Sequence, residues 1–273
     1  MTGGGRLALI AGRGMLPRIV VAALPVRPVV AALDGFAPDG LTPDVMFRVE
    51  RLVPFLDHLA GQGVTRVIFA GAVQRPRLDP ALFDPATAQL VPQLLAALQG
   101  GDDAALRGVI EIFEEAGLAV IGVDQAVPDL VPGAGLLCGT LTDADRRDAT
   151  RAAEIVAALG AVDVGQGAVV AQGLCLAIEA LPGTDAMLDF VAATGTGLRP
   201  DPQGAHGLLY KAPKPGQDLR VDLPAIGAAT VARAAAAGLG GIAWQAGGVL
   251  LLDRAATIAA AQAAGLFLWA RQP

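Results

Sequence analysis

One loop-like segment in the second half of the chain carries the densest group of residues suited to phosphate chemistry. Lys211, Lys214 and Arg220 supply positive charge that can stabilise a transferring phosphoryl group. Asp218 and Asp222 supply carboxylates, and a carboxylate can hold Mg²⁺ or orient an attacking water molecule. Three prolines stiffen the segment because proline fixes φ. A rigid loop with this charge pattern is typical of a catalytic segment, and Asp222 is its central candidate.

A glycine-containing loop near the start of the chain is a second candidate. It follows the apolar run 7–11, which predicts a buried strand, and it leads into a predicted helix over 15–24. Backbone amides at such a strand–loop–helix junction can bind phosphate. Pro17 stands where a dinucleotide-binding motif has its third glycine, so an ordinary tight turn remains open. The candidate ligands of a phosphate or nucleotide are Gly12, Gly14, Met15 and Leu16.

Two further segments in the first half of the chain carry residues that could bind an anion or a metal ion. The loop from Gly71 to Arg75 follows a predicted strand over 64–71, where ligands of open α/β sheets bind. Arg75 could hold an anion there, or it could be an ordinary surface arginine. Asp102 and Asp103 begin a predicted helix; they could hold Mg²⁺ or a ribose hydroxyl, although capping is the favoured role.

Weaker signals lie in the second half of the chain. Glu179 ends an apolar predicted strand, and a glutamate there is costly to bury without a partner. Thr184 and Asp185 open a predicted helix, where such residues normally act as caps. Gln166 precedes a predicted strand, and Thr230 opens another predicted helix.

The elements that position these residues alternate between strands and helices, which predicts an α/β fold. The first domain, residues 1–132, is expected to be Rossmann-like with a parallel sheet. The segment Pro128–Gly139 is rich in proline and glycine and lacks periodicity, so it is predicted to be a linker and hinge. The second domain, residues 138–273, is expected to be a catalytic α/β domain with a mixed sheet, and the ligand is expected in a cleft between the two.

Composition excludes several functions. The net charge is −6 and no basic run occurs, so nucleic acid is not an expected partner. No stretch of about 18 uninterrupted apolar residues predicts a membrane span, although peripheral contact with the inner membrane stays open. No cysteine–histidine cluster has zinc spacing, and a cytoplasmic location is expected.

Taken in order, these segments resemble a bacterial family, the UDP-2,3-diacylglucosamine pyrophosphatases of the lipid A pathway that are not metallophosphoesterases. The resemblance runs over essentially the whole chain at consistent spacing. The segments that carry it are residues 9–17, 69–71, 101–103, 163–167, 179–180, 183–187, 211–215, 220–227, 230–231 and 238–243.

The resemblance implies hydrolysis of UDP-2,3-diacylglucosamine to 2,3-diacylglucosamine 1-phosphate and UMP with Mg²⁺, Mn²⁺ being a possible substitute. It places the essential aspartate, also the metal ligand, in the segment Arg-Val-Asp-Leu-Pro, which is Asp222. The glycine-loop residues named above, with Gly71, Arg75, Asp102, Gln166, Glu179, Thr184, Asp185 and Thr230, are the expected substrate ligands. An oligomer is possible.

Two other functions remain as alternatives. A nucleotide-sugar sensor would bind without turnover, but binding alone does not need a carboxylate near phosphates. A dinucleotide-dependent oxidoreductase fits the first loop, and Asp34 lies about 20 residues beyond it. Pro17 weakens that alternative.

Overall fold

The computed structural model describes residues 5–74, 76–99 and 102–273. The chain divides into two compact units. The first is Met1–Pro128 together with Asp218–Asp222, and the second is Asp129–Gln217 together with Leu223–Pro273. The predicted boundaries assigned Asp218–Asp222 to the second domain, whereas in the structure this short segment belongs to the first.

The first unit is built on a parallel sheet with strand order β3-β2-β1-β4-β5. The strands are β1 (Arg6–Ala11), β2 (Val29–Leu33), β3 (Val45–Phe47), β4 (Val64–Ala70) and β5 (Ala119–Val120). This is the strand order of a Rossmann fold, so the predicted Rossmann-like parallel sheet is confirmed. Every residue of β2 is buried, as expected for a parallel strand that is covered on both faces.

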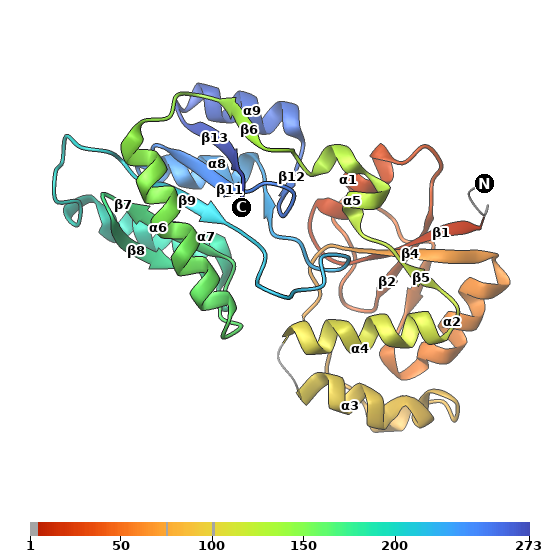
Figure 1. Ribbon diagram of the computed structural model, residues 1–273. Coiled ribbons are helices and arrows are strands. Elements are labelled where there is room, and N and C mark those ends of the chain that lie inside the picture. Colours follow the sequence, from red (N-terminus) through yellow and green to blue (C-terminus); the bar gives the residue numbers. More distant parts are fainter. Residues whose placement is uncertain (1–4, 75, 100–101) are drawn as a thin grey trace. The chain divides into compact units, whose positions relative to one another are not determined.

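The first unit also contains helices, most of which pack on this sheet (Figure 1). They are α1 (Leu16–Ala23), α2 (Leu52–Gly61), α3 (Val91–Gln99), α4 (Asp102–Glu115) and α5 (Val123–Ala126), and α3 packs on α4. The 3₁₀ turns Val49–Arg51, Pro80–Leu82 and Thr87–Leu90 belong to the same unit, and the turn Pro128–Leu130 lies where the first unit ends. Pro17 is tolerated because it lies in the first turn of α1, where its missing N–H has no helical acceptor. The core is anchored by aromatic rings: Phe55 stacks on Phe47 at a centroid distance of 4.0 Å and meets the edge of Phe113.

The second unit has a six-stranded sheet with order β6-β13-β11-β9-β7-β8. Its strands are β6 (Gly135–Cys138), β7 (Gly167–Ala171), β8 (Leu174–Ile178), β9 (Leu208–Lys211), β11 (Gly241–Gln245) and β13 (Phe267–Arg271). β9, β11 and β13 are parallel, whereas β6 and β7 run against them, so the predicted mixed sheet is confirmed. A separate small sheet pairs β10 (Ala225–Ile226) with β12 (Leu250–Leu251).

Helices cover both faces of the larger sheet. The helices are α6 (Asp143–Gly160), α7 (Gly183–Thr194), α8 (Ala228–Ala236) and α9 (Arg254–Ala263), and a 3₁₀ turn spans Gly195–Gly197. Alternate strand residues face opposite layers: Leu208 and Tyr210 pack with α6, whereas Leu209 packs with α7, α8 and α9. Figure 1 shows α6 crossing one face of the sheet. The second unit is therefore a three-layer α/β sandwich.

Three strands were missed by sequence reasoning: β10, which has only two residues, β3, and β6, which lies in the predicted linker. β6 falls inside Pro128–Gly139 and pairs antiparallel with β13 at the end of the chain. The unpredicted β3 is an edge strand of three residues. All three are too short to show an apolar period, and long-range pairing decides them.

Among the residues that the structure describes, no helix has the length and apolarity needed to cross a bilayer.

Candidate active site

A buried polar cluster in the second unit joins three of the predicted site residues. The Nζ atom of Lys211 donates a hydrogen bond to the Thr184 hydroxyl at 2.7 Å, and Thr184 donates to the Glu179 carboxylate at 2.9 Å. Lys211 Nζ also lies 3.5 Å from Glu179 Oε2. Only 6% of the Lys211 side chain and 13% of the Glu179 side chain are exposed. The charge of each is therefore compensated within the fold.

The sheet brings this cluster together at one edge. Lys211 is the last residue of β9, Glu179 directly follows β8, and Thr184 lies in the first turn of α7. β7 runs antiparallel to both strands, so its first residue, Gly167, lies opposite Lys211. A Cβ on Gly167 would lie 2.6 Å from Glu179 Oε2, so a larger residue there would displace the carboxylate from its present position.

Lys214 lies in the loop that follows β9 and is held within the second unit. Its ammonium group forms an ion pair with Asp163, a residue whose φ of 57° is left-handed. Its backbone N–H donates to Gln217 Oε1 at 2.8 Å, and Gln166 Nε2 donates to the same oxygen at 3.3 Å. Gln166 and Lys214 are thus connected through Gln217, a residue that sequence reasoning had not singled out.

Asp222 lies in the first unit, directly after the turn Leu219–Val221, and is half-buried. Val221 packs against the apolar core of that unit, which anchors the turn. The predicted loop is therefore divided: Lys211 and Lys214 belong to the second unit, whereas Arg220 and Asp222 belong to the first. The chain passes from one unit to the other between Lys214 and Arg220, and the gathering of these charges around one ligand stays a prediction.

Arg220 is engaged by two carboxylates. Its Nη2 donates to Asp218 Oδ2 at 2.7 Å, and its Nη1 donates to Glu114 Oε1 at 2.7 Å. These hydrogen bonds, first of all that to Asp218, raise the pKa of Arg220, and Arg220 holds the pKa of Asp218 below its ordinary value. This arrangement ties the turn before Asp222 to α4 of the first unit, so Arg220 acts in the structure as an anchor of the loop.

The two glycine loops of the first unit lock onto each other. Gly12 N donates to Ala70 O at 2.8 Å, and Arg13 and Ala72 exchange a pair of backbone hydrogen bonds. A Cβ on Gly12 would lie 2.7 Å from Ala72 O, and one on Gly71, whose φ is +96°, would lie 2.6 Å from Gly12 O. These glycines are needed for the close approach of the loops. Because the amide of Gly12 is already used, it is not available to a phosphate as predicted.

The next residues of the same loop leave their backbone amides exposed at the start of α1, as an anion site would need. Gly14 has a φ of +92°, and a Cβ there would meet nothing within 4 Å. The amides of Gly14, Met15 and Leu16 have no acceptor among the described residues, since N–H groups at a helix start have no helical partner. They are the amides of this loop that an anion can reach.

The remaining predicted residues have other partners or lie outside the description. Asp185 pairs with Arg233 of α8 at 3.3 Å, and Thr230 accepts a hydrogen bond from Gly227 N at 3.3 Å as part of the cap of α8. Arg75 lies outside the described residues, and of Asp102 only the backbone, at the first position of α4, is described. Neither Thr184 nor Asp185 caps α7, whose start has no side-chain cap.

Comparison with known sequences decides the family. The LpxI N-terminal domain matches residues 6–130 and the LpxI C-terminal domain matches residues 133–269. The UDP-2,3-diacylglucosamine pyrophosphatase LpxI of Caulobacter vibrioides is 38% identical over 275 residues, which cover 98% of each chain. This chain belongs to the LpxI family.

The family assignment agrees with the resemblance drawn from the sequence motifs. In an LpxI family member, the Rossmann-like unit corresponds to the N-terminal domain and the mixed-sheet unit to the C-terminal domain. The segment Asp218–Asp222 lies within the stretch matched by the C-terminal domain although it packs with the first unit. Its partner Glu114 carried no sequence signal, because a lone glutamate on an amphipathic helix is indistinguishable from a solvated one.

The arrangement of the carboxylates determines how Mg²⁺ could be held. Within residues 5–74, 76–99 and 102–273, no group of three or more His, Cys, Asp or Glu side chains is placed to hold a metal. Mg²⁺ commonly keeps several waters and binds through one or two carboxylates together with substrate phosphates. A single half-buried carboxylate at Asp222 fits that mode.

Proposed function

We propose that this protein hydrolyses the pyrophosphate bond of UDP-2,3-diacylglucosamine and releases 2,3-diacylglucosamine 1-phosphate and UMP. The observation that carries the proposal is the match to both LpxI domains along nearly the whole chain, which includes the Asp222 segment. The hydrolase would act in lipid A biosynthesis.

In this reaction Asp222 orients the attacking water and accepts its proton as the phosphorus–oxygen bond to the leaving phosphate breaks. The cations of the second unit, Lys211 and Lys214, stabilise charge that develops on the phosphate oxygens. For Lys211 this requires that the ammonium group exchange Thr184 for a substrate oxygen. The free amides at Gly14, Met15 and Leu16 are suited to the uridine-side phosphate.

Arg220 receives a different role from the one its charge first indicated. Both of its terminal nitrogens donate to carboxylates, so it holds the turn that presents Asp222 rather than binding a phosphate. Glu179 likewise acts through Lys211, because its carboxylate lies on the buried ammonium group.

The reaction is proposed to need Mg²⁺, with Mn²⁺ as a substitute, held by Asp222 and the pyrophosphate of the substrate. Bound there, the ion would neutralise part of the charge on the phosphates. A cytoplasmic location is proposed because both cysteines, Cys138 and Cys175, are free thiols, as in reducing compartments.

The decisive experiment incubates the pure protein with UDP-2,3-diacylglucosamine and Mg²⁺ and follows UMP by chromatography. We expect UMP and diacylglucosamine 1-phosphate in equal amounts. Tight binding of the substrate without any UMP would support the nucleotide-sugar sensor instead. Release of UDP rather than UMP would place the cleavage at the sugar bond and contradict the proposal.

A further inference from the structure

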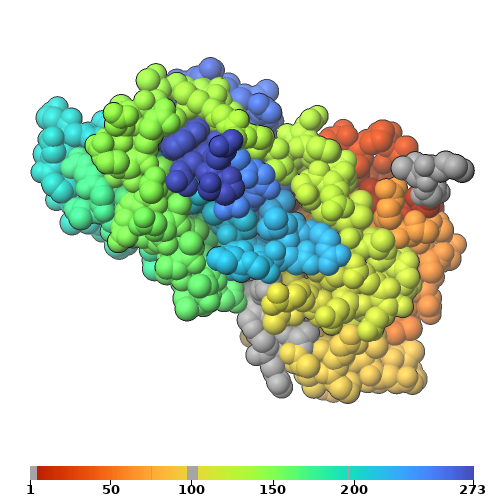
Figure 2. Space-filling view, viewed as in Figure 1, coloured from red at the N-terminus to blue at the C-terminus, as the bar shows by residue number. Residues whose placement is uncertain are grey.

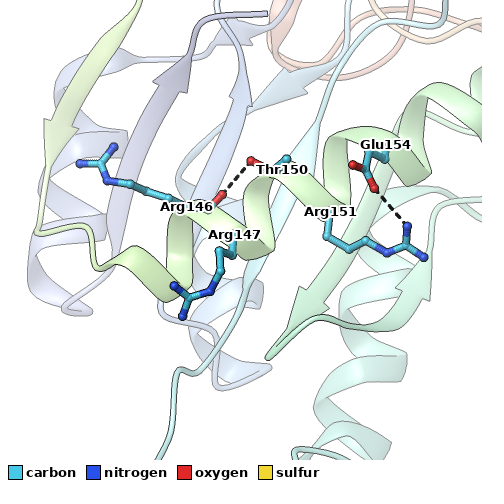
Figure 3. A pocket seen from close by; sticks show the side chains of 5 residues that line it. All are labelled: Arg146, Arg147, Thr150, Arg151 and Glu154. Atoms are coloured by element: carbon cyan, nitrogen blue, oxygen red, sulfur yellow. Dashed lines mark hydrogen bonds and ion pairs between the residues drawn. The ribbon is translucent and has the colours of Figure 1, made fainter.

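The outer face of α6 presents a group of arginines to solvent. Arg146, Arg147 and Arg151 are exposed, and together with Thr150 and Glu154 they line a shallow depression (Figure 3). α6, green in Figure 2, lies at the surface of the second unit. The opposite side of the helix is buried by Ala149, Ala152 and Val156, so the polar face is directed to solvent.

The positive charge on this face is only partly compensated. Arg151 pairs with Glu154 at 3.1 Å. Arg146 lies over the ring of Trp269, with its guanidinium carbon 5.4 Å from the centroid, and Arg147 has no ion pair in the part of the chain that the structure describes. Arg271 adds a fourth cation, since its Nη2 donates to the Thr150 hydroxyl at 3.5 Å.

Two of the four carboxylates of α6 are used internally, whereas Asp143 and Glu154 are exposed and offset part of this charge. Asp145 accepts from the amide and hydroxyl of Thr142 in the capping box of α6. Asp148 is buried and accepts from the amides of Gln172 and Gly173 at 2.8 and 2.7 Å. The four arginines still outnumber Asp143 and Glu154, so a chain with a net charge of −6 carries a local positive excess here.

An apolar rim borders the arginines. Trp269 of β13 lies opposite Leu136 of β6 in the antiparallel pair, so the two side chains share one face of the sheet. Trp269 is half-buried beneath Arg146, and 45% of Leu136 is exposed at the sheet edge. Cations beside a tryptophan and an exposed leucine form the combination found at membrane interfaces.

We propose that the arginine face of α6, defined as Arg146, Arg147 and Arg151 together with Arg271, binds the surface of a membrane that contains anionic phospholipids. The arginines are spread along an exposed helix and do not converge on one point, which suits many headgroups rather than a single soluble phosphate. The adjoining apolar rim favours the same partner. The contact would hold the protein where a diacylated substrate resides, but it is independent of the hydrolytic step.

The experiment measures binding of the full-length protein to sedimenting vesicles of phosphatidylcholine alone or with phosphatidylglycerol, in the absence of substrate. We expect binding only to the anionic vesicles and its loss in high salt, since each arginine near an anionic surface contributes about fivefold. Arg147→Gln/Arg151→Gln should weaken binding by about 30-fold, on the same basis. The matched control is Arg66→Gln/Arg254→Gln, which removes the same charge from two exposed arginines elsewhere.

Equal weakening of vesicle binding by both double variants would show that binding depends only on net charge, and it would overturn the proposal. Absence of binding to anionic vesicles would do the same. Displacement by glycerol phosphate, at a concentration matching that of the lipid phosphate, would reveal a soluble-phosphate site instead. Turnover of detergent-dispersed UDP-2,3-diacylglucosamine should be unchanged in Arg147→Gln/Arg151→Gln, so a failure of the proposed hydrolysis would be recognised separately.

Discussion

The ammonium group of Lys211 and the carboxylate of Glu179 lie 3.5 Å apart in a nearly closed environment, with the Thr184 hydroxyl bridging them. Removal of one partner from such a pair leaves the other buried and uncompensated, which costs about 3–5 kcal/mol. The pair therefore links the stability of the second unit to a cation proposed for phosphate binding.

Lys211→Met should accordingly lower the free energy of unfolding by about 3–5 kcal/mol, measured by urea denaturation. The double variant Glu179→Gln/Lys211→Met should recover much of that loss, because no unpaired charge remains. Both variants should lose turnover if Lys211 binds phosphate. A double variant with restored stability and normal activity would remove Lys211 from the mechanism.

Asp222→Asn should leave the fold and substrate binding intact, because the amide keeps the shape of the side chain. Turnover should fall by at least about 10²-fold, the usual contribution of a positioned acid–base group. Binding can be compared with wild type by calorimetry in the absence of Mg²⁺, where it should be equal or tighter because a negative charge near the phosphates is removed. The control is Asp218→Asn, which should be less harmful to kcat. If Asp218→Asn proves the worse lesion, the central residue has been assigned wrongly.

The Asp218–Arg220 pair should make stability depend on pH. Arg220 lowers the folded-state pKa of Asp218 below that of the unfolded chain, which is about 3.9. The stabilisation is therefore fully present above about pH 4 and is lost as pH falls through the lowered pKa. Melting temperatures of wild type and Asp218→Asn should differ at neutral pH and converge in acid. A constant difference down to pH 2 would show that the carboxylate charge is not the cause.

Activity should require Mg²⁺ or Mn²⁺ and should survive zinc-selective chelation, since the candidate ligand is a hard carboxylate. Titration of the metal into EDTA-treated protein, followed by UMP release, measures this. Full turnover in excess EDTA would refute the metal requirement without affecting the assignment of Asp222 as the residue that orients water.

The locked glycine loops give a stability prediction for the first unit. Gly71→Ala should destabilise strongly, because it combines a left-handed φ with a Cβ placed 2.6 Å from Gly12 O. Gly14→Ala should lower the stability less, because the new Cβ would enter open space and only the strain of the left-handed φ remains. Gly61→Ala, in helix α2 with nothing within 4 Å, should be neutral or stabilising by up to about 1 kcal/mol. Thermal unfolding of the three variants checks this order.

The local sequence determined most of the elements and the class of the fold. Apolar runs bounded by glycine predicted β1, β2, β4, β7 and β11 close to their observed bounds, because buried strands need continuous apolar side chains. The residue types of the Asp222 segment predicted phosphate chemistry, and motifs at consistent spacing predicted the family that the comparisons confirm.

The tertiary structure decided which side chains and segments interact with each other. The sequence could not show that Arg220 would turn to Glu114, a residue 106 positions away, or that Lys211 would lie on Glu179. Nor could it show that Asp218–Asp222 would pack with the first unit, or that Gly135–Cys138 would join β13 as a strand. Each of these depends on pairing between distant segments. The charge of a side chain indicates what kind of group it can bind, but only the folded chain determines which carboxylate lies beside it.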